Sequence, residues 1–302
     1  MKVLLPIISA LFIFSSCIKD IQDPVWIEVS EWSLVANPDQ DLAAEHDPGV
    51  LSHAIKDVWL YVDNSLVGVY EVPFKVPVLS SGSKEIRLYP GVHNNGIAGT
   101  KKRYPFLKEM ILTADLVPNE VVQIDPVTMY KTQTEFWIED FDDASIVIED
   151  GNATLVSMER VSQPDDPVIF DSQLNGVAFG RISLTAAANK YVGSTNVIEI
   201  EGVPIGLPSG VECYLEIDYH NTADLITGLI GVSSTNIFRN TMVRLNKQFE
   251  SQVRWKKIYI DLREVVSSST TSDYFEFSFD ALLPSGVNSG EINIDNIKAV
   301  HF

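Results

Sequence analysis

The chain has 302 residues, and its 22 lysines and arginines face 41 aspartates and glutamates, which gives a formal net charge of −19. A field of this sign repels phosphate backbones, so nucleic acid is excluded as an expected partner. Hydrophobic residues make up 45% of the chain. This content excludes general disorder, and the length is enough for two domains.

Residues 1–16 have the pattern of an export signal. Lys2 is the single charged side chain in these residues, and a short apolar run follows it. A helix of about 14 residues, at about 1.5 Å each, would be about 21 Å long. The hydrocarbon core of a bilayer is about 30 Å thick, so we do not expect a permanent transmembrane span.

The segment Phe14–Cys17 closes this run and resembles the processing site of bacterial lipoproteins. The resemblance implies that Cys17 is lipidated and becomes the mature N-terminus, where several acyl chains anchor a protein stably to a membrane. The segment Ile18–Asp20 resembles the surface-export signal of Bacteroidetes lipoproteins, which implies a surface-exposed protein of the outer membrane. An ordinary cleaved signal with a chance cysteine is the alternative.

The second cysteine, Cys213, lies in the alternating segment Val211–Tyr219. Alternation with a period of two predicts a strand, and it places Cys213 on the apolar face. We therefore expect a buried structural thiol. A lipidated Cys17 would leave Cys213 without a disulfide partner.

Residues 17–50 are expected to form the anchor and a polar tether, and residues 51–132 a small β domain. Val58–Val62 and Leu66–Tyr70 predict two strands joined by a turn, and Glu85–Tyr89 alternates cleanly. The order of these segments resembles PEGA-like and related immunoglobulin-like envelope modules. The resemblance implies an immunoglobulin-like β domain.

The segment Tyr89–Leu107 holds a cationic cluster that stands out in this acidic chain. Arginine and aromatic side chains are enriched at the centres of protein interfaces. We interpret the segment as a docking loop for an outer-membrane protein, and the whole chain as an assembly subunit of an envelope complex. A solvated hairpin tip is the alternative. The candidate partner-binding residues are Lys101, Lys102, Arg103, Tyr104 and Phe106.

Residues 133–302 are expected to form a second, larger β domain, because strand candidates recur there with turn residues between them. The segment opens with Trp137–Asp143, holds Trp255–Leu262 near its end and closes with Ile292–Lys298. These patterns resemble the galactose-binding-like jelly rolls of carbohydrate-binding modules. Such patterns indicate an all-β sandwich rather than a particular activity.

The same resemblance implies an alternative function, the binding of polysaccharide by aromatic side chains. Tyr214, Tyr259 and Tyr274 alternate with apolar residues, so they lie opposite the expected core faces. The opposing interpretation is that these tyrosines cover a second sheet or pack under loops. The candidate ligand-binding residues are Tyr214, Trp255, Tyr259 and Tyr274, with Tyr191 as a further aromatic candidate.

The resemblance also implies a candidate structural calcium site at Glu139, Asp142 and Asp295, in the first and last strand segments. Calcium takes about six to eight oxygen ligands, and solvated carboxylates are the alternative. No other cofactor is expected, because the five histidines are scattered without the spacing of zinc ligands. The sequence holds no hydrolase or P-loop motif, so we do not expect an enzyme.

Overall fold

The computed structural model describes residues 23–41, 43–196, 199–200, 203–204 and 207–302. The expected signal peptide, residues 1–16, and the expected lipidation site, Cys17, lie outside these ranges. The described chain consists mainly of strands, as predicted. Its helices are α1 (Arg263–Ser268) and the short 3₁₀ turns η1 (Ala44–His46) and η2 (Glu250–Gln252). Within the described ranges, no helix has the length and apolar character needed to cross a membrane.

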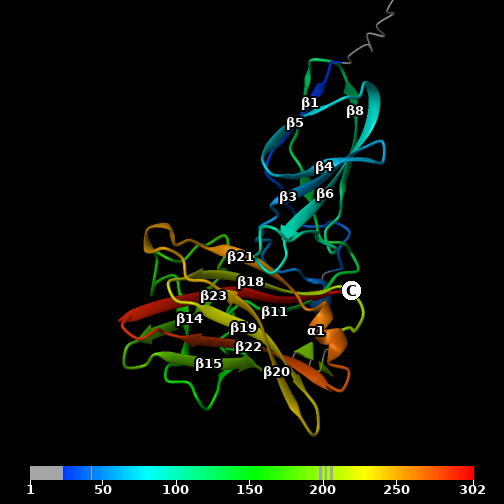
Figure 1. Ribbon diagram of the computed structural model, residues 1–302. Coiled ribbons are helices and arrows are strands. Elements are labelled where there is room, and N and C mark those ends of the chain that lie inside the picture. The colour runs from blue at the N-terminus through cyan, green and yellow to red at the C-terminus, as the bar shows by residue number, and fades with distance from the viewer. Residues whose placement is uncertain (1–22, 42, 197–198, 201–202, 205–206) are drawn as a thin grey trace, which may run out of the picture.

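The N-terminal part, which comprises the strands between residues 25 and 128, is built mainly from two sheets around one core (Figure 1). The larger sheet has the order β4-β3-β6-β7, with β8 also paired to β6, and all its pairs are antiparallel. The hairpin between β3 and β4 turns at Asp63 and Asn64, which both have positive φ angles, as such tight turns require. The strands of this sheet are β3 (Asp57–Val62), β4 (Ser65–Glu71), β6 (Gly82–His93), β7 (Lys101–Arg103) and β8 (Met110–Leu116).

The smaller sheet has the order β5-β1-β9, with β1 in the middle. Val25, Ile27 and Val29 of β1 are fully buried and alternate with partly exposed residues. This corrects the expected tether over residues 17–50 in part, because Val25, Ile27, Val29 and Trp32 belong to the core of the N-terminal part. The remaining strands are β1 (Val25–Val29), β5 (Phe74–Val78) and β9 (Val121–Ile124), with the separate pair β2 (Ser33–Leu34) and β10 (Val127–Thr128).

The β-sandwich, which comprises the strands between residues 135 and 301, has two facing sheets, as predicted (Figure 1). The sheet nearer the N-terminal part has the order β13-β14-β23-β18-β21, and β11 also pairs with β23. Its strands are β11 (Glu135–Glu139), β13 (Met158–Ser162), β14 (Ala178–Thr185), β18 (Cys213–Asn221), β21 (Lys256–Asp261) and β23 (Ser289–His301).

The second sheet of the β-sandwich has the order β12-β15-β22-β19-β20. Its strands are β12 (Ile148–Asp150), β15 (Lys190–Thr195), β19 (Leu225–Val232), β20 (Ile237–Leu245) and β22 (Tyr274–Leu282), and a separate hairpin joins β16 (Glu199–Ile200) to β17 (Val203–Pro204). Phe277 and Phe279 from this sheet meet Leu215 and Ile217 from the other in one core. Cys213 lies in the same core as a free, fully buried thiol, as predicted.

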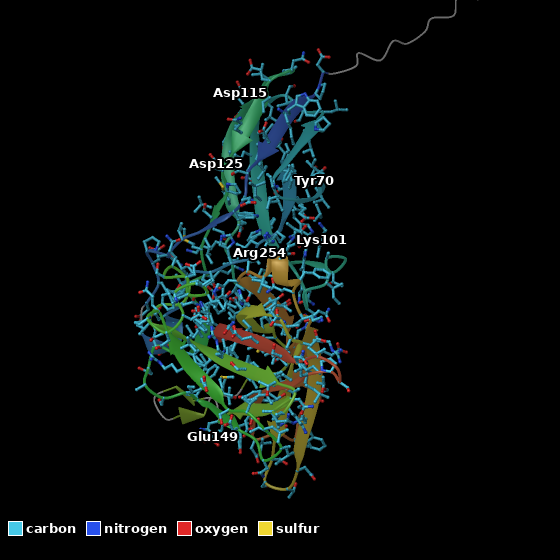
Figure 2. All side chains as sticks on the ribbon, turned by 90° about the vertical axis from the view of Figure 1, so that its left-hand side faces the viewer. Tyr70, Lys101, Asp115, Asp125, Glu149 and Arg254 are labelled. Atoms are coloured by element: carbon cyan, nitrogen blue, oxygen red, sulfur yellow. The ribbon has the colours of Figure 1, made fainter. Side chains whose placement is uncertain are left out.

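The two parts share a buried contact, and β1 lies at the end of the N-terminal part that is away from the β-sandwich (Figure 1). Tyr214, Tyr259 and Val300 of the β-sandwich belong to the same apolar cluster as the core of the N-terminal part. In Figure 2, Lys101 and Arg254 mark the level at which the two parts meet. The outer face of this β-sandwich sheet is therefore covered in part by the chain itself, around Tyr214 and Tyr259.

Candidate functional site

The expected docking loop packs against the chain's own β-sandwich. The Nζ atom of Lys102 lies 2.9 Å from a carboxylate oxygen of Glu212 and 2.9 Å from one of Asp261. Burial alone would lower the pKa of Lys102, but hydrogen bonds to Tyr214 and to these two carboxylates raise it above its ordinary value. Lys102 thus forms its ion pairs within the molecule.

The two aromatic residues proposed to bind a partner are also inside. Tyr104 is 2% exposed and Phe106 is fully buried, so the structure corrects their assignment as external anchors. The ring of Tyr104 meets those of Tyr214 and Tyr259 edge-on, with centroids 5.2 and 4.9 Å apart. Aromatic pairs in this geometry stabilise a contact beyond their buried area.

Lys101 and Arg103 lie on the exposed face of the same strand. Lys101 forms an ion pair with the buried carboxylate of Asp57. The Arg103 guanidinium lies 4.3 Å from the ring centroid of Tyr89 and 5.1 Å from that of Tyr61. Both cations therefore have partners within the N-terminal part.

Tyr214 and Tyr259, two of the candidate ligand-binding residues, are 0% and 3% exposed. The alternation did place them opposite the sandwich core, but the N-terminal part covers that face. The Tyr259 hydroxyl accepts a hydrogen bond from the Ala54 amide at 3.0 Å. The structure thus corrects their role from ligand contact to packing between the two parts. Tyr191, the further candidate, is fully buried in the sandwich core.

A buried network of charges joins the two parts beside these tyrosines. Lys257 Nζ lies 3.0 Å from Glu216 Oε2, and the Tyr104 hydroxyl donates to Glu216 Oε1 at 2.5 Å. Burial alone would raise the pKa of Glu216, but the Lys257 and Lys298 cations hold it below its ordinary value. Lys298 donates to the carbonyls of Pro48 and Val50, both at 2.5 Å. Sequence analysis missed this network, whose members lie in strands far apart in the chain.

Two neighbouring cavities that share lining residues open along β21 where the parts meet, and together they form what we call the β21 groove. The first, of about 1060 Å³, lies between β20 and β21 under the connection from Asn246 to Trp255. The second, of about 810 Å³, lies between β21 and the N-terminal part. The residues that line both cavities are Gly96, Tyr219, Arg254, Lys256 and Ile258.

Of the candidate ligand-binding residues, Trp255 and Tyr259 line the second cavity. Tyr259 is 3% exposed, whereas Trp255 is partly exposed. Its indole Nε1 donates to the Ile169 carbonyl at 2.8 Å, and its ring meets Phe179 edge-on with centroids 5.5 Å apart. Trp255 is therefore held in one orientation while it remains partly exposed. Tyr274 lies on β22 of the second sheet and does not line either cavity.

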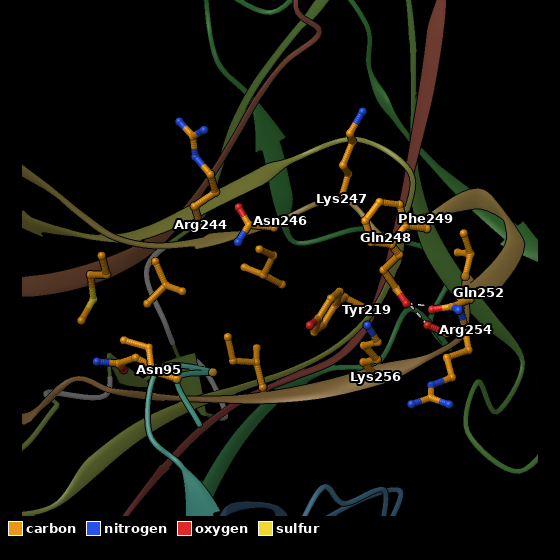
Figure 3. Close-up of a pocket in the computed structure, with 17 residues that line it drawn as sticks. Asn95, Tyr219, Arg244, Asn246, Lys247, Gln248, Phe249, Gln252, Arg254 and Lys256 are labelled. Atoms are coloured by element: carbon orange, nitrogen blue, oxygen red, sulfur yellow. Dashed lines mark hydrogen bonds between the residues drawn. The ribbon is translucent and has the colours of Figure 1, made fainter. Parts of the chain in front are cut away.

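The centre of the first cavity is formed by Tyr219 and Lys256, which face each other in the register of β18 and β21 (Figure 3). The turn at Asn95 and Gly96 reaches this strand from the N-terminal part. The Asn95 amide donates to the Tyr259 carbonyl at 2.8 Å, and the Asn95 side chain accepts from the Asp261 amide at 2.9 Å. The N-terminal part thus contributes directly to the wall of the groove.

The cationic lining of the groove is a feature that sequence analysis missed. Arg244, Lys247, Arg254 and Lys256 all line the first cavity. They are concentrated in residues 244–257 of the sequence, a second cationic segment in addition to residues 101–103. The density of lysine and arginine in that segment was a signal that could have found them.

The expected calcium ligands do not form a metal site. Both carboxylate oxygens of Glu139 accept backbone amides, from Phe141 at 2.7 Å and from Val147 at 2.9 Å. Among the described residues, no group of three or more candidate ligands can hold a metal ion. Asp142 accepts the amides of Val177 and Ala178, and Asp295 accepts Asn175 and the Asn296 amide, so these carboxylates close loops of the sandwich. The residues therefore do not fit a calcium ion.

No family model and no curated protein matches this chain. Solved structures that resemble it include the enzymatically active domain of a tailspike protein of bacteriophage CBA120, with 11% identity and a TM-score of 0.33 over 51% of this chain and 19% of that chain. A family 11 carbohydrate-binding module from Clostridium thermocellum, in complex with a mixed-linked tetrasaccharide, has 13% identity and a TM-score of 0.33 over 54% of this chain and 94% of that one.

A third structure, of a carbohydrate-binding module from the β-sandwich superfamily, has 12% identity and a TM-score of 0.36 over 81% of this chain and 86% of that chain. Likeness at these identities and scores does not assign a ligand to this protein. The chemistry of the β21 groove has to be argued from its own residues.

Proposed function

We propose that this protein is a non-catalytic polysaccharide-binding protein and that the β21 groove is its binding site. The observation that carries the proposal is the composition of the groove, in which the partly exposed Tyr219 and Trp255 lie beside polar side chains. Tyrosine and tryptophan combine a flat apolar face with a polar tip, which suits a sugar ring with an apolar face and hydroxyl groups at its edge.

The form of the groove also supports a polymer as the ligand. The two cavities share Tyr219, Arg254 and Lys256 in their linings, and both open to solvent. Figure 3 shows the first of them. An open groove admits an inner stretch of a chain, whereas an enclosed pocket admits only a small molecule or a chain end. Asn95 and Asn246 supply amides along the wall, which are able both to donate to and to accept from hydroxyl groups.

We do not propose the docking role that the sequence suggested for residues 89–107, because Lys102, Tyr104 and Phe106 contact the chain's own β-sandwich.

The predicted lipid anchor at Cys17 is compatible with polysaccharide binding. β1 lies at the end of the N-terminal part away from the β-sandwich (Figure 1). We propose that an anchored chain would hold the groove away from the membrane, on the outer-membrane surface.

The test is retention of the protein in affinity gels that contain a panel of neutral and acidic polysaccharides. Trp255→Ala and Tyr219→Ala should each weaken retention by on the order of tenfold, because each removes a ring from the groove. Tyr274→Ala is the matched control, since it removes an aromatic ring of the same β-sandwich away from the groove, and it should leave retention unchanged. Retention that survives both groove variants would exclude the β21 groove as the site.

A further inference from the structure

The charge of the first cavity of the β21 groove is opposite to that of the whole chain. The second cavity is lined by both signs, with Glu31, Asp171 and Asp218 beside its lysines and arginine. The protein has a net charge of −19, yet the first cavity is lined by Arg244, Lys247, Arg254 and Lys256. None of the lining residues that the structure describes for this cavity is an aspartate or glutamate. A local positive field in an acidic molecule concentrates anions at one place and repels them elsewhere.

The described side chains leave most of this positive charge without internal compensation. Arg244 has the Asp224 carboxylate at 3.5 Å and is 59% exposed. In the described part of the chain, neither Lys247, Arg254 nor Lys256 forms an ion pair with a carboxylate. Lys102 and Lys257, by contrast, are each matched by two carboxylates at the contact between the parts.

The backbone that carries these cations is fixed. The side chain of Gln248 is 8% exposed and donates to the Arg254 carbonyl at 3.0 Å and to Asn221 Oδ1 at 3.3 Å (Figure 3). The Lys247 amide donates to Asp224 Oδ1 at 2.7 Å. These hydrogen bonds fix both ends of the connection between β20 and β21. They therefore fix the backbone positions from which Lys247 and Arg254 extend.

Lys256 and Arg254 are two cations that line the same cavity. Burial, followed by the nearby Arg254 cation, lowers the pKa of Lys256 from its ordinary value. An anion placed between the two cations would relieve their repulsion. Tyr219 opposite Lys256 provides an aromatic surface beside that position.

We propose that the β21 groove selects acidic polysaccharides, whose carboxylate or sulfate groups pair with Lys247, Arg254 and Lys256 while the sugar rings pack on Tyr219 and Trp255. This inference rests on the proposed function and adds the chemical class of the ligand. Arginine binds carboxylate and sulfate oxygens through two parallel donors, whereas lysine acts as a point charge. The acidic remainder of the surface disfavours a polyanion as densely charged as nucleic acid.

The experiment compares matched pairs of probes on the full chain by affinity gel electrophoresis. Polygalacturonate is compared with its fully methyl-esterified form, and dextran sulfate with dextran, so that each pair differs in charge on one backbone. Single-stranded oligothymidylate is a further probe. We expect retention by a charged member at least about tenfold tighter than by its neutral counterpart, and weaker retention as salt is raised. The two pairs distinguish carboxylate from sulfate as the group bound.

The variant that tests the residues is Lys247→Gln/Arg254→Gln/Lys256→Gln. Its matched control is Lys75→Gln/Lys84→Gln/Lys190→Gln, which removes the same number of cations from residues that do not line the groove. The groove variant should lose on the order of tenfold in retention of the acidic probe, and the control less than about twofold. In both variants the substituted side chains are exposed or partly exposed in the native chain, so we expect both variants to fold.

The outcomes separate the inference from the function on which it rests. Equal retention by neutral and charged probes, or an equal loss in the control variant, would overturn acidic selectivity while polysaccharide binding stood. Retention by oligothymidylate as tight as by the acidic polysaccharides would overturn it in favour of a general polyanion site. Failure of every polysaccharide to bind would overturn both proposals.

Discussion

Lys257 and Glu216 form an ion pair that is buried between the two parts of the molecule. Their side chains are 2% and 0% exposed, and Lys257 Nζ lies 3.0 Å from Glu216 Oε2. Glu216 also accepts the hydroxyl groups of Tyr104 and Tyr130, which belong to the N-terminal part. A single carboxylate of the β-sandwich is therefore held by both parts, which makes their relative orientation dependent on it.

We expect Lys257→Met to lower the free energy of unfolding by about 3–5 kcal/mol, because the change leaves the Glu216 carboxylate buried without its cation. The measurement is denaturant unfolding at neutral pH. Lys75→Met is the control, since Lys75 pairs with Glu28 at 3.0 Å on the surface with both side chains more than 40% exposed. That pair should contribute at most about 1 kcal/mol. Equal losses in the two variants would contradict the buried network.

The neighbouring lysine, Lys298, predicts an alkaline dependence of stability. Burial, with the Lys257 cation next, lowers the pKa of Lys298 to about 8, although Glu216, Asp218 and Asp295 act in the opposite direction. Between about pH 8 and the pKa of an unfolded lysine, about 10.4, the unfolded chain binds more protons at this residue than the folded chain. The contribution of Lys298 to stability therefore rises with pH across this window.

The check is the free energy of unfolding measured from pH 8 to pH 10 in the native chain and in Lys298→Met. The native chain should gain stability relative to the variant by about 3 kcal/mol at most over this range. Lys190→Met, at a partly exposed lysine of β15, should leave the pH dependence as it is in the native chain. Parallel pH profiles for the native chain and Lys298→Met would contradict the lowered pKa.

The docking loop gives a third prediction, which separates internal packing from binding of an external partner. Phe106 is fully buried, and its ring lies 6.0 Å from that of Tyr214 across the contact between the parts. Phe106→Ala should lower the free energy of unfolding by about 3–5 kcal/mol, as deletion of a buried aromatic ring does. Arg103→Ala, on the exposed face of the same loop, should change it by about 1 kcal/mol or less. Thermal unfolding of both variants decides between the two roles, because a loop reserved for a partner would tolerate both changes.

For β18, β21 and β22 the sequence predicted which side faces the sandwich core, but not what covers the other side. Ile258 and Ile260 face the core as expected, and Tyr259 lies opposite. The alternation therefore identified the strand correctly. A period of two cannot tell a face covered by another part of the chain from one that faces solvent, and this is why Tyr214 and Tyr259 were assigned to a ligand.

The site itself depended on strand register, which a single sequence does not provide. Asp218 lies opposite Lys257, and Tyr219 opposite Lys256, only once β18 pairs with β21. Trp255 was predicted as a ligand contact and does line the β21 groove. It is the residue that immediately precedes β21. Asn95 and Gly96 lie far from β21 in the sequence, and no local pattern connects them.

The turn of the N-terminal part at Gly96 gives the last prediction, because its shape sets the distance between the two parts at the groove. Gly96 has a φ of +70°, in the left-handed region that side chains other than glycine rarely adopt. A Cβ atom there would lie 3.0 Å from the Ile258 Cδ1 atom, so the isoleucine would have to move. Ile258 lines both cavities of the groove.

We therefore expect Gly96→Ala to lower the free energy of unfolding by about 1–2 kcal/mol and to weaken polysaccharide retention several-fold. Gly82→Ala is the control for backbone strain alone, since Gly82 has a φ of +80° and no atom near the added Cβ. It should show a similar loss of stability with unchanged retention. Gly99→Ala, which has neither constraint, should change neither quantity. If Gly96→Ala and Gly82→Ala weaken retention equally, the turn does not shape the binding site; if only Gly96→Ala does, the N-terminal part is a functional wall of the β21 groove.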